Sequence, residues 1–111
     1  MKNYLLLYYA PESAIEKMGT ASKEEKEAGM KQWMDWKSKN EENVIDFGAP
    51  MMGAYRIEAD GSESRKQSTI TGYSLIQAND RDHAESLVKD HPHLDWTPEC
   101  AIEVFECIPM D

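Results

Sequence analysis

The chain has 111 residues, of which 41% are hydrophobic and 30% charged, and its formal net charge is -9. This size and composition suit one globular domain spanning residues 1–111, with one modest core. The acidic balance argues against nucleic acid and against anionic membrane surfaces as partners.

Residues 4–9, with the sequence YLLLYY, form the first predicted strand. Both of its faces are apolar, so we expect one to meet the core and the other to meet a second sheet or a partner chain. The run is too short for a signal peptide, and no segment reaches the length of a transmembrane helix. The spacing of Cys100 and Cys107 does not favour a disulfide within one strand, and we therefore expect a cytoplasmic protein.

The next part of the chain predicts two helices and a broken strand. A short helical piece covers residues 11–18, and a long amphipathic helix covers 22–43, beginning with a Ser-x-x-Glu capping box. The extended segment 44–55 contains two glycines and a proline, which predict a kink or bulge. Residues 59–62, with the sequence ADGS, predict a turn.

The remaining elements complete an α+β pattern. We predict a strand over residues 68–78, a helix over 80–91 that Asn79 caps and Pro92 stops, and a strand over 101–108. The resulting order is that of the split βαβ or ferredoxin-like fold, with one antiparallel sheet and two helices on one face. The other sheet face is bare in a single chain, which predicts a homodimer that packs sheet against sheet.

Several segments of this sequence form a recognisable set: residues 4–9 (YLLLYY), 48–51 (GAPM), 70–78 (ITGYSLIQA), Asp80, 82–84 (DHA), His91-Pro92 and 102–104 (IEV). Together they resemble the YCII-related (DGPF-type) family, and the resemblance covers nearly the whole chain. The resemblance implies a dimeric α/β barrel with a small cleft on each protomer, in which a His and an Asp act on a small molecule. This chain departs from the family pattern because it lacks the Asp-Gly-Pro-Phe tetrapeptide, to which residues 60–63 come nearest, and lacks a His in the first helix.

His91 is the first candidate for a catalytic acid or base. It ends the apolar face of the predicted helix, and a helix C-terminus favours the protonated imidazole. A His that caps helix carbonyls would fit the same position. His91, His93 and Asp95 also have a spacing that metal ligands can use, but Pro92 and the missing fourth ligand favour a polar loop, so we predict no metal.

Carboxylates of the last strand and its preceding loop are candidate partners for His91. Glu103 and Glu106 point to opposite faces of the strand, so one of them is buried if either face is fully covered. Glu103 or Asp95 would orient His91, whereas solvated acids on an edge strand are the structural alternative.

The candidates for ligand binding are three tyrosines and two residues of the predicted kinked segment 44–55. Tyr4, Tyr8 and Tyr73 can present hydroxyl groups to a small ligand, or can belong to the core or an interface. Gly48 and Pro50 can rim a cleft, or can only shape the sheet. Motifs for nucleotides and other cofactors are absent from the sequence, so we predict no cofactor.

These residues favour a cofactor-independent enzyme that moves a proton on a small organic molecule, as an isomerase or lyase does. A non-catalytic module that binds a small metabolite or regulates an assembly is the alternative. A monooxygenase on the same architecture has little support from individual residues. The fold itself decides none of these.

Overall fold

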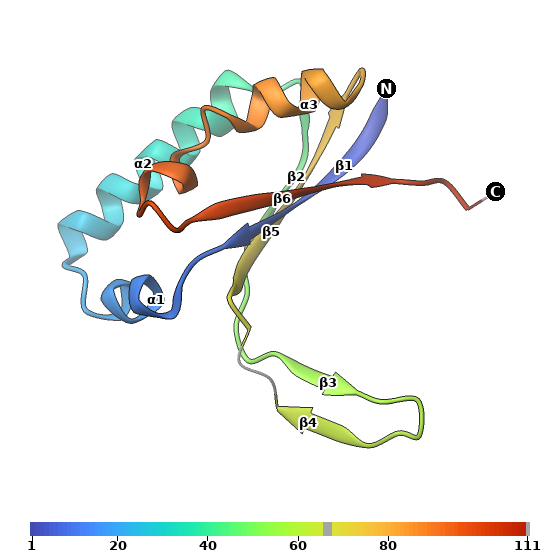
Figure 1. Ribbon diagram of the computed structural model, residues 1–111. Helices are drawn as coiled ribbons and strands as arrows, with labels where there is room; N and C mark the ends of the chain where they lie inside the picture. Colours follow the sequence, from blue (N-terminus) through green and yellow to red (C-terminus); the bar gives the residue numbers. More distant parts are fainter. Residues whose placement is uncertain (66–67, 111) are drawn as a thin grey trace.

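The computed structural model describes residues 1–65 and 68–110, which form a ferredoxin-like α+β fold with one added hairpin (Figure 1). The main sheet has four antiparallel strands in the order β2-β5-β1-β6, and β3 and β4 form a separate pair. The elements are β1 (Lys2–Tyr9), α1 (Glu12–Gly19), α2 (Lys23–Lys39), β2 (Val44–Pro50), β3 (Tyr55–Ile57), β4 (Glu63–Arg65), β5 (Ile70–Ala78), α3 (Arg81–Val88), the 3-10 helix η1 (Pro92–Asp95) and β6 (Ala101–Cys107). The predicted fold class is therefore confirmed.

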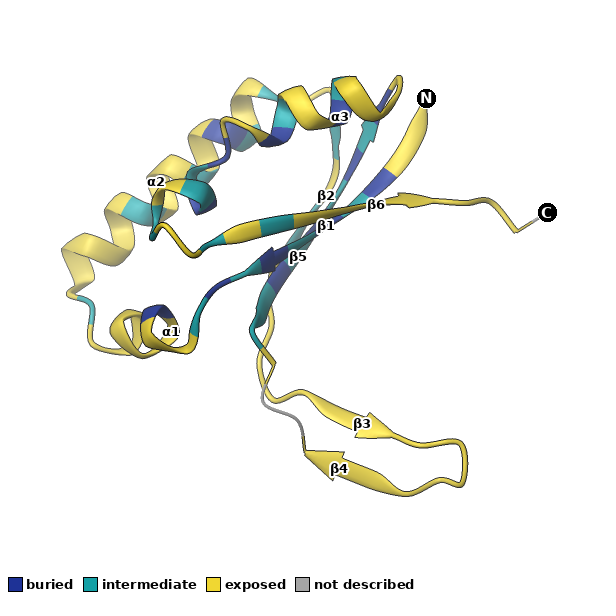
Figure 2. Cartoon of the chain, in the orientation of Figure 1, coloured by how far each residue is buried: buried dark blue, intermediate teal, exposed yellow. Residues whose placement is uncertain are grey.

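The central strand β1 divides its side chains between two environments. Tyr4, Leu6 and Tyr8 are at most 3% exposed and pack beneath α2 and α3 with Ile76 of β5. We call this side of the sheet the covered face. The opposite side of the sheet, which we call the open face, carries the residues that alternate with these along the strands. It is only partly buried, as Figure 2 shows. Its side chains include Leu5, Leu7, Tyr9, Tyr73, Leu75, Glu103, Phe105 and Cys107.

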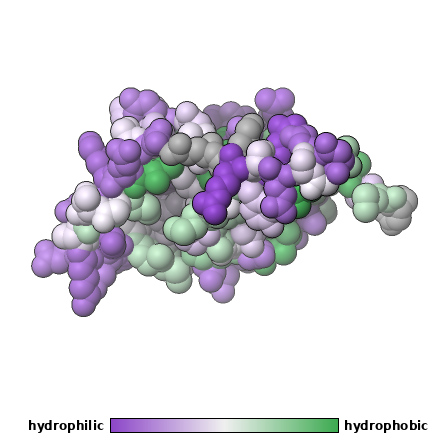
Figure 3. Space-filling model, turned by 90° about the horizontal axis from the view of Figure 1, so that it is seen from below, coloured by the Kyte–Doolittle hydropathy of each residue, from purple (hydrophilic) through white to green (hydrophobic). Residues whose placement is uncertain are grey.

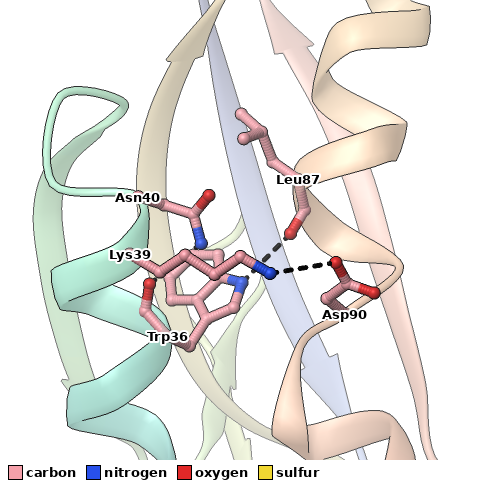
Figure 4. A network of polar contacts seen from close by, with 5 residues as sticks. All are labelled: Trp36, Lys39, Asn40, Leu87 and Asp90. Atoms are coloured by element: carbon pink, nitrogen blue, oxygen red, sulfur yellow. Dashed lines mark hydrogen bonds and ion pairs between the residues drawn. The ribbon is translucent and has the colours of Figure 1, made fainter.

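Helices α2 and α3 are fixed by their caps and by contacts with each other. The Ser22 hydroxyl accepts a hydrogen bond from the Glu25 amide, and the Asp80 carboxylate accepts one from the His83 amide. The indole of Trp36, which is 4% exposed, donates to the Leu87 carbonyl at 3.0 Å across the helix pair (Figure 4). These bonds hold both helices over the covered face.

The hairpin of β3 and β4 projects away from the sheet, and its residues are exposed (Figures 1 and 2). Its turn contains Gly61 at a φ of 88°, as the ADGS sequence predicts. The hairpin is thus an addition to the ferredoxin-like frame. Seen from below, the surface of the whole molecule carries mostly hydrophilic residues, with hydrophobic residues in separate patches (Figure 3).

Several predicted boundaries were wrong. The long helix ends at Lys39, because the side chain of Asn40 donates to the Trp36 carbonyl and its backbone closes the last turn. The helix after β5 ends at Val88, before His91, and is capped by Asp80 rather than Asn79. Pro92 starts the 3-10 turn η1 instead of stopping α3.

The extended segment after Asn43 is two strands rather than one kinked strand. β2 ends at Pro50, and the chain reaches β3 only at Tyr55. Within β2, Gly48 has a φ of 81°, and a Cβ atom there would overlap the backbone carbonyl of Tyr73. Gly48 therefore permits the bulged pairing of β2 with β5.

Candidate functional site

A cluster of aromatic rings and two histidines occupies the covered face where η1 meets β1 and α2. His91 and His93 are 1% and 3% exposed. The ring centroid of His91 lies 4.4 Å from those of Trp33 and Trp36 and 4.9 Å from that of Tyr8. We call these five residues the histidine cluster.

The hydrogen bonds of His91 define which of its nitrogens carries a proton. Its Nδ1 accepts a hydrogen bond of 3.0 Å from the backbone N–H of His93, so Nδ1 is unprotonated. In the neutral imidazole the proton then resides on Nε2. That Nε2–H is buried and has no hydrogen-bond partner. A buried polar atom without a partner is rare, and it marks this position for a functional explanation.

The imidazole of His91 is held neutral. Burial, followed by the nearby His93, lowers its pKa to about 3. The expectation that a helix C-terminus favours the protonated form was wrong, because α3 ends three residues earlier and the ring is enclosed by apolar neighbours. His91 can therefore donate a hydrogen bond at neutral pH, but it carries no charge.

His93 ties η1 to the end of β1. Its Nε2 lies 2.7 Å from the carbonyl oxygen of Tyr9, to which a protonated Nε2 donates. Burial lowers the pKa of His93, while the backbone carbonyl of Tyr9 acts in the opposite direction. The position of His91 is therefore set by η1, through the bond from the His93 amide, and η1 is in turn anchored to the sheet.

Below the rings, a chain of hydroxyl groups is fully satisfied. Tyr8 donates from its hydroxyl to Ser74 Oγ at 2.7 Å, and Ser74 donates to the Phe47 carbonyl at 2.6 Å. Burial raises the pKa of Tyr8 to about 12. The phenol is therefore a neutral wall of the cluster, and it links β1, β5 and β2.

The structure separates the three residues predicted to be catalytic. His91 lies on the covered face, whereas Glu103 pairs with Leu7 on the open face. Asp95 is exposed at the end of η1. Glu106 is also exposed, so neither strand carboxylate is buried within this chain.

The predicted ligand-binding residues are divided in the same way. Tyr4 and Tyr8 lie on the covered face, and only Tyr8 belongs to the histidine cluster. Tyr73 lies on the open face, opposite Leu7 of β1. Gly48 and Pro50 lie in β2, where Pro50 is exposed.

Sequence reasoning missed Trp33, Trp36 and Ser74 as members of this site. The two tryptophans are three residues apart on α2, a spacing that places them on one helical face. Ser74 lies two residues before Ile76 in β5 and therefore shares its side of the strand, so its parity could have placed it on the buried side.

Within residues 1–65 and 68–110, no group of three or more His, Cys, Asp or Glu side chains is arranged to hold a metal ion. In the same described part of the chain, no helix is long and apolar enough to cross a membrane.

Comparison with solved structures supports the fold. The chain is similar to 5-chloro-2-hydroxyhydroquinone dehydrochlorinase from Burkholderia phenoliruptrix, solved in complex with 2,5-dihydroxybenzoquinone. The TM-score is 0.52 at 13% sequence identity, over 91% of this chain and 90% of the other. No protein-family model and no curated protein matches the sequence. At this identity the likeness establishes a common fold only.

Proposed function

We propose that this protein is a distant YCII-related enzyme that moves a proton on a small, oxygen-bearing organic molecule without a cofactor, as an isomerase or lyase does. The observation that carries the proposal is the buried, unpartnered Nε2–H of His91. The family resemblance of the sequence and the dehydrochlorinase of the same fold both support a small-molecule substrate.

The proposed role of His91 is that of a neutral hydrogen-bond donor. A substrate carbonyl that accepts from Nε2–H is polarised, and the negative charge that develops on its oxygen is stabilised in an environment of low dielectric. The imidazole needs no reorganisation, because the His93 amide already holds its other nitrogen. Catalysis by this route needs a neutral His91, which the lowered pKa supports.

The proton acceptor we propose is Asp95, the carboxylate of the same 3-10 turn. Asp95 is exposed, so it can exchange its proton with water between turnovers. Glu103 lies on the other face of the sheet and does not orient the His91 of its own chain.

The walls of the histidine cluster favour a flat ligand. Trp33, Trp36 and Tyr8 surround His91 with ring faces and edges, which suits a small ring that carries oxygens on its rim. The ligand of the similar dehydrochlorinase, 2,5-dihydroxybenzoquinone, is of this kind. Trp33 is only half-buried, and in this proposal its side chain moves to admit the substrate.

The proposed assembly is a cytoplasmic homodimer in which two open faces meet. Leu5, Leu7 and Tyr9 alternate with the buried residues of β1, and no helix of the described residues covers them. Phe105 on the same face is 49% exposed. Sedimentation should find a dimer at micromolar concentration, and Leu7→Lys should produce a monomer. A wild-type monomer under these conditions would overturn the dimer but would leave the role of His91 standing.

The function is tested with His91→Asn. The asparagine carbonyl can still accept from the His93 amide, but the Nε2–H is lost. We expect 2,5-dihydroxybenzoquinone and related hydroxylated rings to bind the wild type and to bind the variant at least about tenfold more weakly, with loss of any turnover. His83→Asn is the matched control, since His83 lies on α3 outside the cluster. Equal affinity of the wild type and His91→Asn would contradict the proposal.

A non-catalytic module that binds a small metabolite is the second candidate. Among the described residues, no carboxylate makes a hydrogen bond with His91 or His93, which leaves the acid–base pair undefined. This candidate predicts ligand binding in the histidine cluster, no turnover of any bound compound, and no dependence of ligand affinity on Asp95→Asn. Proton exchange from a bound ligand into solvent, lost in Asp95→Asn, would decide for the enzyme.

A further inference from the structure

A second candidate site lies on the covered face, beside the histidine cluster, in a groove between α3 and the edge strand β6. The groove has a volume of about 540 Å³, a size typical of small-molecule pockets. Its lining comes from one side of α3, from the covered side of β6 and from the start of β1: Tyr4, Arg81, Glu85, Val88, Ile102, Val104 and Glu106. In Figure 1, α3 lies above β6.

The hydroxyl of Tyr4 is a buried polar group with no partner. Tyr4 is 3% exposed, and its oxygen makes no hydrogen bond. The neighbouring carboxylate of Glu106 is held by the Lys2 ammonium at 3.4 Å. Burial and then the Glu106 carboxylate raise the pKa of Tyr4, so the phenol keeps its proton. The hydroxyl is thus a protonated donor beside the Glu106 carboxylate, with which it forms no close hydrogen bond.

Arg81 supplies the unpaired positive charge of the groove. Among the described residues it forms no ion pair, whereas Glu85 is bound to Lys89 at 3.3 Å. Arg81 is the first residue of α3, where the backbone amides of the helix add positive potential. The two carboxylates of the groove therefore each have a lysine, and the guanidinium alone lacks a counter-ion.

The groove has a polar end and an apolar end. In the strand register Glu106 lies opposite Tyr4, and Ile102 lies opposite Tyr8, so the two pairs are separated by four residues along the sheet. Val88 lies seven residues after Arg81, about 10 Å along the helix. Val104 lies between Glu106 and Ile102 on the same side of β6, so apolar side chains line the groove from its polar end to its apolar end.

We propose that this groove binds a small organic monocarboxylate with an apolar body. The carboxylate accepts hydrogen bonds from the Arg81 guanidinium and the Tyr4 hydroxyl, and the body lies along Val104 and Ile102 toward Val88. Ligands with two or three negative charges are disfavoured, because Glu85, Glu106 and the net charge of -9 repel them. The site lies on the covered side of the sheet and stays open in the proposed dimer.

The test is an NMR titration of the folded protein with 3-phenylpropionate, compared with the neutral 3-phenylpropionamide. We expect the acid to shift the methyl signals of Val88, Ile102 and Val104, and the amide to bind at least about tenfold more weakly. Arg81→Gln should weaken binding of the acid by a similar factor. Arg56→Gln, which removes the same charge from the exposed hairpin, should not.

Tyr4→Phe separates binding from folding. Removing a hydroxyl that has no partner should leave the melting temperature of the free protein unchanged or higher, while the affinity for 3-phenylpropionate falls. Equal affinity for the acid and the amide, no shift at millimolar acid, or an unchanged affinity in Arg81→Gln would each overturn the proposal. Because the readout is binding at the groove, these results are independent of turnover at His91.

Discussion

The two faces of the central strand β1 differ in burial, although the residues of both faces are apolar and alternate along one segment. On the covered face, Leu6 is fully buried and Tyr8 hydrogen-bonds to Ser74. On the open face, Leu5 and Leu7 are equally apolar but only partly buried. The covered face is completed by the chain's own helices, whereas no helix among the described residues covers the open face. The hydrophobicity of a strand thus indicates how much of it is covered, but it does not indicate by what.

Truncation of adjacent leucines should give the largest difference in stability between the two faces. Leu6→Ala leaves a cavity in the core and should destabilise the fold by about 3 kcal/mol. Leu7→Ala should cost less than about 1.5 kcal/mol in the dissociated chain, because that side chain is already partly exposed. Urea unfolding of both variants at low protein concentration measures the difference. Equal losses would mean that the open face is as well packed as the covered one.

The stability contributed by the covered face should depend on pH. In the folded chain the pKa of His91 is about 3, against 6.5 ordinarily. The unfolded chain therefore binds a proton that the folded chain excludes. Stability from this group is fully present above about pH 6.5 and is lost progressively as the pH falls toward the folded pKa.

Between ~pH 7 and ~pH 5 this loss amounts to about 2 kcal/mol. Burial lowers the pKa of His93 as well, so its contribution has the same sign. Urea unfolding at the two pH values should therefore give a steep dependence for the wild type and a shallower one for His91→Asn. An equal slope in both proteins would show that His91 titrates normally.

Adjacent tyrosines provide a smaller test. Tyr8→Phe removes the donor to Ser74 in a buried site and should cost about 1 kcal/mol. Tyr9→Phe removes a hydroxyl on the open face and should change stability by less than about 0.5 kcal/mol. Thermal unfolding of the two variants measures both effects. A larger loss in Tyr9→Phe would mean that the open face contains a polar contact formed only in the assembly.

The smallest effect concerns reactivity rather than stability. Cys107 lies on the open face and is exposed in this chain, whereas Cys100 lies before β6 and is partly buried. If two open faces meet, labelling of Cys107 by a maleimide should slow as protein concentration rises, and labelling of Cys100 should not. Mass spectrometry of the labelled peptides measures both rates. Rates independent of concentration would argue that the open face stays free.

Sequence reasoning reached the fold because its signals are local and repeated. The apolar run of β1, the cap of α2 at Ser22 and the turn at residues 59–62 each depend on neighbours in the chain, and the structure has all three. Helix ends were less predictable. Whether α3 continued to His91 depended on contacts of η1 with β1, which no local pattern contains.

The candidate site was predicted only in part, for a physical reason. The burial of His91 followed from its place after an apolar helical face, but its charge state did not. That state depends on Trp33, Trp36 and Tyr8, which arrive from α2 and β1. Parity within a strand separated Glu103 from Glu106, yet it could not tell which side the helices cover. Local sequence patterns could not predict which residues meet only through tertiary packing.

The order of pairing around β1 has a consequence for how the chain acquires its structure during synthesis. β1 is made first, but both of its neighbours are made much later: Tyr4 lies opposite Ile76 in β5 and opposite Glu106 in β6. The most apolar strand therefore leaves the ribosome long before either partner exists. Contacts so distant in sequence slow folding and leave an exposed edge open to aggregation. Until β6 emerges, the nascent chain should be a client of chaperones that bind extended apolar segments.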